Sequence, residues 1–300
     1  MALIFTNEDV KVIGNIAMEG MLGYLPSAAT MGRRVEADGT IEEGDTIKVP
    51  VYTKGGAALA FNDDTNNFGT VRNDAIEFKD VVMDQFLSRG FGIRDSKKRK
   101  VDPLELARIN GQAIGEAMMT NVLSKVTAAN FSEIAHTGLA ANFTLDDVVD
   151  IHKKTRQLKF NRDNTWLVLT VDYIAELMKD TTLQTTESNL GLGVVMNAEV
   201  NRLARMNIIE NDFLPHNNEN LVGYVTDGRG LVFATDIIAP DANTPTDMIF
   251  ETITHEGTGL TLGVRHFYDK NLGKAITNFS ILFGSAVGNG AALARIRSAE

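Results

Sequence analysis

The stretch DPLELARINGQAIGEAMMTNVLSKVTAANF, residues 102–131, decides how the rest of the chain is interpreted. Asp102 suits an N-cap, Pro103 suits the first helical position, and Glu105 completes a capping box. Apolar residues then recur at helical spacing: Leu106, Ile109, Ala113, Ala117 and Val122, with Ile114, Met118 and Val126 beside them. The pattern predicts one helix over 102–130, about 40 Å long and well above the average helix length.

Two glycines lie inside this predicted helix, Gly111 and Gly115. Each weakens helix propensity by about 1 kcal/mol relative to alanine. We therefore expect close packing of another element against the helix at these positions.

The preceding residues predict a short helix and a long hairpin. Residues 8–21 place apolar side chains at helical spacing within an otherwise irregular N-terminal stretch. Residues 46–52 (TIKVPVY) favour a strand, and Pro50 places it at a sheet edge. The polar tip KGGAALAFNDDTNNFGT follows, and a second strand is expected over 71–78. A tip of this length cannot bury a core of its own, so we expect it to contact something else.

Residues 79–93 (KDVVMDQFLSRGFGI) predict a helix that ends at Gly90. The basic run RDSKKRK, 94–100, comes next. It is interpreted either as a solvated loop or as a contact with an acidic neighbour or nucleic acid.

The second half mixes helices and strands. Helices are expected over 144–158, 173–179 and 197–206, and strands over 166–171, 221–238, 259–266 and 275–283. Gly228 follows Asp227, which predicts a hairpin turn. Because the order is not a repeating βαβα pattern, the fold class is α+β.

Composition excludes several classes of protein. The 300 residues carry a net charge of −10, which argues against a groove-binding nucleic-acid protein. Cysteine is absent, so disulfides, thiolate chemistry and Cys-ligated metals are excluded. No apolar run reaches a membrane span, and the N-terminal residues lack the features of a secretory signal.

Catalytic motifs are also absent. The five histidines, His136, His152, His216, His255 and His266, form no HExxH and no i, i+4 pair. No nucleophile elbow or Walker loop occurs. Acidic pairs such as Asp146–Asp147 fit a helix N-terminus without further explanation. The sequence thus favours a protein that is not an enzyme and has no cofactor or metal.

The order of these segments carries a resemblance. A GDTIKVPVY strand (44–52) opens a polar hairpin, and the long DPLELARINGQAIGEAMMTNVLSKV helix follows. The segments DDVVDIHKKTRQL and WLVLTVDYIAELMKD come next, and the stretch GLTLGVRHFYDKNLGKAITNFSILFGSAVGNGAALARIRSA closes the chain. This arrangement resembles the major capsid proteins of tailed bacteriophages with the HK97-type fold.

The resemblance implies an expected domain organisation: an N-terminal arm (1–45), an E-loop (46–78), a peripheral P domain (79–170) with a spine helix over about 102–130, an axial A domain (171–260) and C-terminal P-domain strands (261–300). It implies pentamers and hexamers in an icosahedral shell around double-stranded DNA. The expected location is the virion, assembled in the host cytoplasm without a membrane. We expect any scaffolding, portal and decoration proteins to be separate chains.

The hairpin tip and the basic run supply the candidate intersubunit contacts: Lys54, Phe61, Asp63, Asp64, Phe68, Arg94, Lys97, Lys98 and Arg99. Some members of the family crosslink a lysine to a neighbour's asparagine, but no asparagine partner for Lys54 is identifiable. Two alternatives stay open. One is an encapsulin-like bacterial compartment with the same fold, and the other is an α+β hydrolase or transferase whose active site carries no motif.

Overall fold

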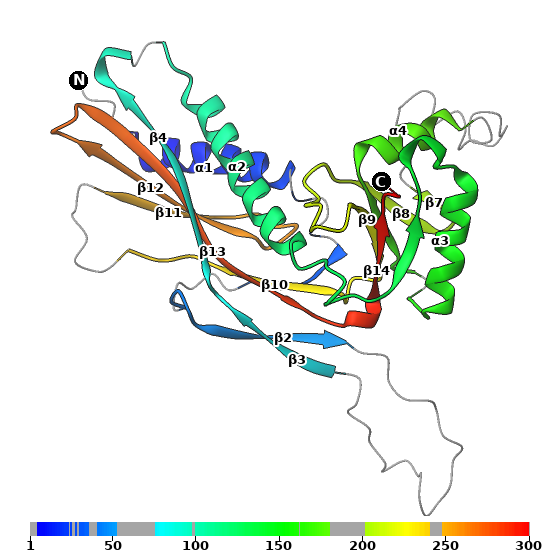
Figure 1. Ribbon diagram of the computed structural model, residues 1–300. Helices are drawn as coiled ribbons and strands as arrows, with labels where there is room; N and C mark the ends of the chain where they lie inside the picture. Colours follow the sequence, from blue (N-terminus) through cyan, green and yellow to red (C-terminus); the bar gives the residue numbers. More distant parts are fainter. Residues whose placement is uncertain are drawn as a thin grey trace, which may run out of the picture.

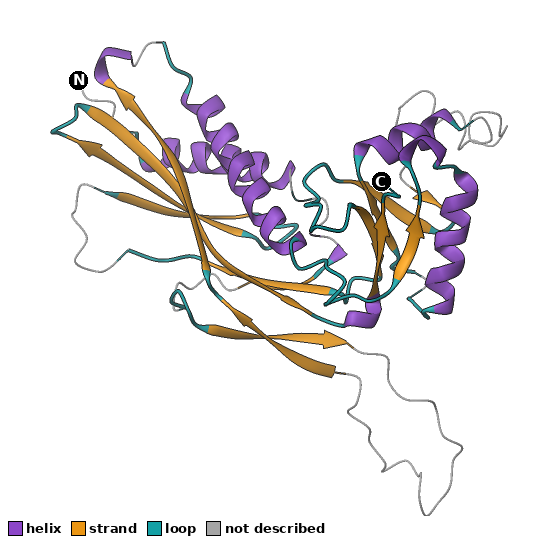
Figure 2. Cartoon of the chain, viewed as in Figure 1, coloured by secondary structure: helices purple, strands orange, loops and turns teal. Residues whose placement is uncertain are grey.

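The fold consists of two sheets with their helices and a projecting two-stranded hairpin (Figures 1 and 2). The computed structural model describes residues 5–23, 25, 28, 30–35, 41–52, 76–97, 100–161, 163–180, 202–240 and 248–299. The helices are α1 (Asn7–Gly23), α2 (Pro103–Leu123), α3 (Leu145–Gln157) and α4 (Val171–Lys179), with short 3-10 turns η2 (Asp95–Lys97), η3 (Ala140–Asn142) and η4 (Gly290–Ala292).

The first sheet has the order β1-β10-β13-β12-β11, and β4 also pairs with β13. Its strands are β1 (Gly32–Val35), β4 (Gln85–Arg94), β10 (Leu231–Asp236), β11 (Ile249–Thr254), β12 (Thr261–Asp269) and β13 (Lys274–Val287). The long strand β13 pairs antiparallel with β4, β10 and β12. It is therefore the central strand of the first body, by which we mean this sheet with helices α1 and α2. The second body is the other six-stranded sheet with helices α3 and α4.

The first sheet is covered on both faces where β10 pairs with the C-terminal half of β13, and side chains there alternate between the two faces. Phe233, Ile281 and Phe283 belong to the core that contains α1 and α2. Their neighbours Val232 and Leu282 pack on the other side against the hairpin β2 (Thr46–Tyr52) and β3 (Ile76–Val82). The sheet thus separates a helical layer from the hairpin (Figure 1).

Helices α1 and α2 cross with almost no space between their backbones. A Cβ added at Gly115 would lie 2.6 Å from the carbonyl oxygen of Met21, and one at Gly111 would lie 2.7 Å from the carbonyl carbon of Ala17. The expected close packing at both glycines is confirmed. It also places residues 7–23 of the expected arm inside the body of the same chain, where Val10, Ile13, Ala17, Met18 and Met21 are buried.

Helix α2 is shorter than its pattern predicts. It spans 21 residues, about 32 Å, and ends before Ser124. Asn217 lies at its C-terminal end, where Nδ2 donates to Leu123 O at 3.1 Å and to Val126 O, beyond the helix, at 2.7 Å. At the other end, the Asp102 carboxylate accepts from the Leu104 N–H at 2.9 Å. The Glu105 carboxylate accepts from Arg108.

The second sheet has the order β5-β14-β9-β6-β8-β7. Its strands are β5 (Ile134–Thr137), β6 (Trp166–Leu169), β7 (Arg202–Leu203), β8 (Met206–Glu210), β9 (Leu221–Thr226) and β14 (Leu293–Arg297). Helices α3 and α4 cover one face, and Thr144 and Asp147 form a capping box at the start of α3. The other face contributes Val168 and Tyr224 to the core of the first body.

Arg295 in β14 joins the two bodies. It is buried, its Nε donates to Phe131 O at 2.7 Å, and its guanidinium pairs with Glu219. Glu219 in turn accepts from the Ala128 N–H at 2.5 Å. Because breaking a buried charge pair costs several kcal/mol, this contact fixes the second sheet to the segment that follows α2.

Three predictions about the elements need correction. The helix expected over 79–93 is instead the end of β3, a bend and β4, because ten residues pair with β13. Strands β7 and β8 replace the described part of the helix expected over 197–206. The turn at Asp227-Gly228 joins no hairpin, since β9 and β10 lie in different sheets. The second sheet takes its strands from residues 134–226 and 293–297, and β10 and β11 belong to the first sheet.

Candidate assembly surfaces

The hairpin β2–β3 has one buried and one exposed face. In register, Tyr52 lies opposite Ile76, and Pro50 lies opposite Phe78. Ile47, Val49 and Val51 alternate with this set and are buried against the first sheet. Phe78 is 63% exposed and Tyr52 is 61% exposed. Large apolar side chains gathered on one outer face are typical of a surface that another protein covers.

Contacts at both ends of the two strands hold the hairpin against the rest of the chain. A Cβ at Gly284 of β13 would lie 2.7 Å from the carbonyl carbon of Val82, so only glycine permits β3 to approach this closely. Arg229 donates to Tyr52 O at 3.3 Å and pairs with Asp227, whose side chain is buried. The hydrogen bond with Asp227 raises the pKa of Arg229, which keeps this link charged.

The structure describes two of the nine candidate contact residues. Arg94 ends β4 and Lys97 lies in η2, and both are exposed at the end of the first sheet. The other seven, Lys54, Phe61, Asp63, Asp64, Phe68, Lys98 and Arg99, lie outside the described residues. The sequence analysis did not predict the exposed apolar face of β2–β3. In TIKVPVY and IEFKDVV, however, apolar residues occur on both sides of the alternating strand pattern, and this indicates two apolar faces.

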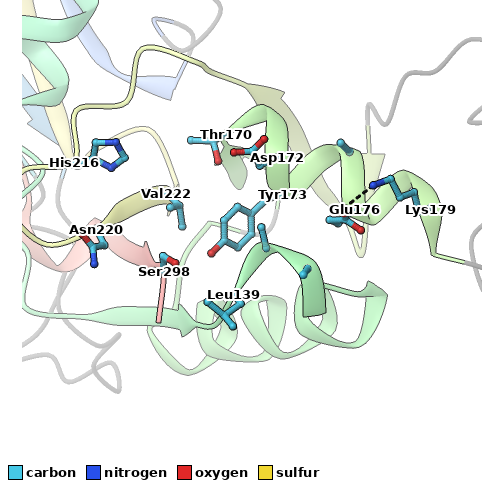
Figure 3. A pocket seen from close by; sticks show the side chains of 13 residues that line it. Leu139, Thr170, Asp172, Tyr173, Glu176, Lys179, His216, Asn220, Val222 and Ser298 are labelled. Atoms are coloured by element: carbon cyan, nitrogen blue, oxygen red, sulfur yellow. Dashed lines mark hydrogen bonds and ion pairs between the residues drawn. The ribbon is translucent and has the colours of Figure 1, made fainter. Parts of the chain in front are cut away.

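A cavity of about 670 Å³ opens on the second body beside α4 (Figure 3). Its wall includes Tyr173, Glu176 and Lys179 of α4, together with His216 and Ser298. The Tyr173 hydroxyl donates to Gly138 O at 2.6 Å, and Lys179 Nζ donates to Glu176 at 2.6 Å. These are structural contacts, and they do not pair a nucleophile with a base.

The histidines are dispersed over the molecule. Burial lowers the pKa of His266, whose Nδ1 lies 3.0 Å from Thr277 Oγ1 in the first sheet. Burial and then Arg156 lower the pKa of His152 on α3. Neither lines the cavity. Among the described residues, no three His, Cys, Asp or Glu side chains are grouped as metal ligands.

No helix in the described part of the chain combines the length and the hydropathy that a membrane span needs.

No protein-family model matches the sequence, and no curated protein matches it. Solved structures do match the fold. The capsid of the cyanophage P-SCSP1u aligns with a TM-score of 0.56 and 13% identity, over 90% of this chain and 87% of that chain. The mature capsid of bacteriophage PhiM1 aligns with a TM-score of 0.54 and 10% identity, over 91% and 86%. The chain has the HK97-type capsid fold.

A virus-like particle also matches this fold. A virus-like particle from Pyrococcus furiosus aligns with a TM-score of 0.53 and 12% identity, over 95% of this chain and 98% of that chain. The three alignments have similar TM-scores, and what they share with this chain is the fold.

Proposed function

We propose that this chain is the major capsid protein of a tailed bacteriophage and builds the icosahedral shell around double-stranded DNA. The observation that carries the proposal is the HK97-type fold over about nine tenths of the chain, matched to phage capsids of similar length. In this role the protein acts by assembly, without catalysis and without a cofactor. Its place is the virion, and its main partner is further copies of itself.

The parts of the fold take the following roles in the proposal. The hairpin β2–β3 with its tip is the E-loop. The first sheet with α1 and α2 is the P domain, and α2 is the spine helix. The second sheet with α3 and α4 is the A domain, which would surround the fivefold and sixfold axes. Any scaffolding, portal and decoration proteins are separate partners.

The outer face of the hairpin supports an intersubunit role. A phenylalanine or tyrosine side chain buries roughly 150–250 Å² when covered. At roughly 60% exposure, Phe78 and Tyr52 each have about 100 Å² or more to bury, which corresponds to about 2–3 kcal/mol each. A neighbouring subunit is the proposed cover. The candidate contacts at the tip, Lys54 to Phe68, would extend the same contact.

Electron microscopy of the purified protein, alone and after co-expression with a scaffolding protein, tests the proposal. Closed shells or rings of five and six subunits are the expected result. A protein that stays monomeric under all these conditions contradicts it. The content of shells separates the phage role from the compartment alternative, because DNA indicates a phage capsid and a packaged enzyme indicates a compartment.

A further inference from the structure

The first sheet carries opposite charges at the two ends of strand β4. At one end lie Arg94, Lys97, Lys100 and Lys274, which we call the basic tip. At the other end lie Glu42, Glu43, Asp45 and Asp84, which we call the acidic base. All eight residues are exposed except Lys274, which is partly buried.

The two clusters cannot neutralise each other within one molecule. Asp84 directly precedes β4 and Arg94 ends it, so ten residues of extended strand separate them. At about 3.3 Å per residue the separation is about 33 Å. The Debye length at physiological salt is about 8 Å, so the attraction between them is screened.

The cations of the basic tip lack partners within the described chain. Arg94 lies directly opposite Lys274 in the β4–β13 ladder, an arrangement of like charges that destabilises a strand pair. The nearby carboxylates are engaged elsewhere: Asp95 accepts from the Tyr268 hydroxyl at 2.6 Å, and Asp269 accepts from the backbone of Asn271 and Leu272. Within the described residues, none of the four cations forms an ion pair.

The acidic base is held in place by backbone contacts. Gly44 N–H donates to Met83 O at 2.8 Å, and Met83 N–H donates to Asp45 O at 2.8 Å. These bonds bring the turn at 42–45 beside the bend between β3 and β4, so its carboxylates lie near Asp84. Lys48 on β2 lies three residues after Asp45, and the four carboxylates outnumber this one cation. No ion pair involves these four carboxylates in the part of the chain that is described.

We infer that the basic tip of one subunit binds the acidic base of a neighbouring copy in a head-to-tail contact. The inference rests on the proposed shell function and names the surfaces that it uses. Clusters of opposite sign at opposite ends of one rigid strand fit a heterologous contact, the kind that closes rings and shells. A second copy suits the basic tip better than nucleic acid does, because the chain itself supplies the matching surface and has a net charge of −10.

Charge reversal in solution tests the contact. The tip variant is Lys97→Glu with Lys100→Glu, and the base variant is Glu42→Lys with Glu43→Lys. All four side chains are exposed, so unassembled protein should melt at the wild-type temperature. Each variant alone should lower the assembled fraction roughly tenfold or more, because like charges then face each other. The wild type should lose assembly as salt rises.

Combining the tip and base variants should restore assembly. The combination also restores the net charge, so the matched control joins the tip variant to Glu19→Lys with Glu116→Lys, two exposed acids on α1 and α2. That control should stay defective in assembly.

Two results overturn the inference while leaving the shell function intact. One is normal assembly of both single variants, and the other is rescue by the control equal to rescue by the base variant. A tip variant that assembles normally but loses DNA retention would assign the tip to nucleic acid instead. Failure of the wild type to assemble would instead count against the shell function.

Discussion

Replacing Gly111 by alanine tests the crossing of α1 and α2. In an open helix the change would stabilise by about 1 kcal/mol. Here the new Cβ would meet the backbone of Ala17, with its carbonyl carbon at 2.7 Å, so one helix must move. Overpacking of a buried contact costs about 1–3 kcal/mol and sometimes more, and the backbone cannot turn aside as a side chain can. We expect a net loss of about 2 kcal/mol in the free energy of unfolding.

The assay is thermal and urea unfolding of unassembled protein followed by circular dichroism. A loss of about 2 kcal/mol corresponds to a Tm lower by roughly 4–8 °C for a chain of this size. Gly23→Ala is the matched control, since Gly23 ends α1 and a Cβ there would meet nothing within 4 Å. It should be neutral or slightly stabilising. If Gly111→Ala melts at or above the wild-type temperature, α1 does not pack on α2 in this way.

Three further predictions address the hairpin, the first sheet and α2. Phe78→Ser, on the exposed face, should change the unfolding free energy by no more than about 0.5 kcal/mol and reduce assembly in light scattering, whereas Val49→Ser on the buried face should destabilise the unassembled protein. Because burial lowers the pKa of His266, the unfolded state takes up its proton first, and stability should fall as the pH drops below about 6.5 through the lowered folded pKa. His266→Asn should reduce that loss when urea unfolding is compared at about pH 7.5 and about pH 5.5, and an unchanged pH dependence would contradict the assignment. Ala117→Pro should cost about 3 kcal/mol or more in the interior of α2, and an unaltered Tm would be inconsistent with a helix there.

Elements with local signals were predictable from the sequence. Capping residues and apolar spacing predicted α2 and α3, and Gly111 and Gly115 predicted a close neighbour without identifying it as α1. The helix prediction for residues 79–93 was wrong. The spacing of their apolar residues fits a helix, but pairing with β13 decides their conformation. Gly90 was the available clue, since a Cβ there would lie 2.8 Å from the Cα of Asn278. Sheet membership depends on partners distant in sequence, which no local pattern encodes.

The candidate contacts were only partly predictable for the same reason. Arg94 and Lys97 were apparent as a basic run in the sequence. Lys274 lies far along the chain, and only the ladder between β4 and β13 brings it beside Arg94. The acidic base likewise combines a turn before β2 with the residue before β4. Each cluster therefore exists only once the sheet has formed.

Strand β14 has a consequence for the synthesis of the protein. It lies between β5 and β9, and its residue Arg295 pairs with Ile134, more than half the chain earlier. A nascent chain on the ribosome therefore presents β9 with an open edge until residue 297 has been translated. Pairings between such distant residues are slow to form, and open strand edges invite aggregation during this interval. The same delay withholds a complete second body from every unfinished chain.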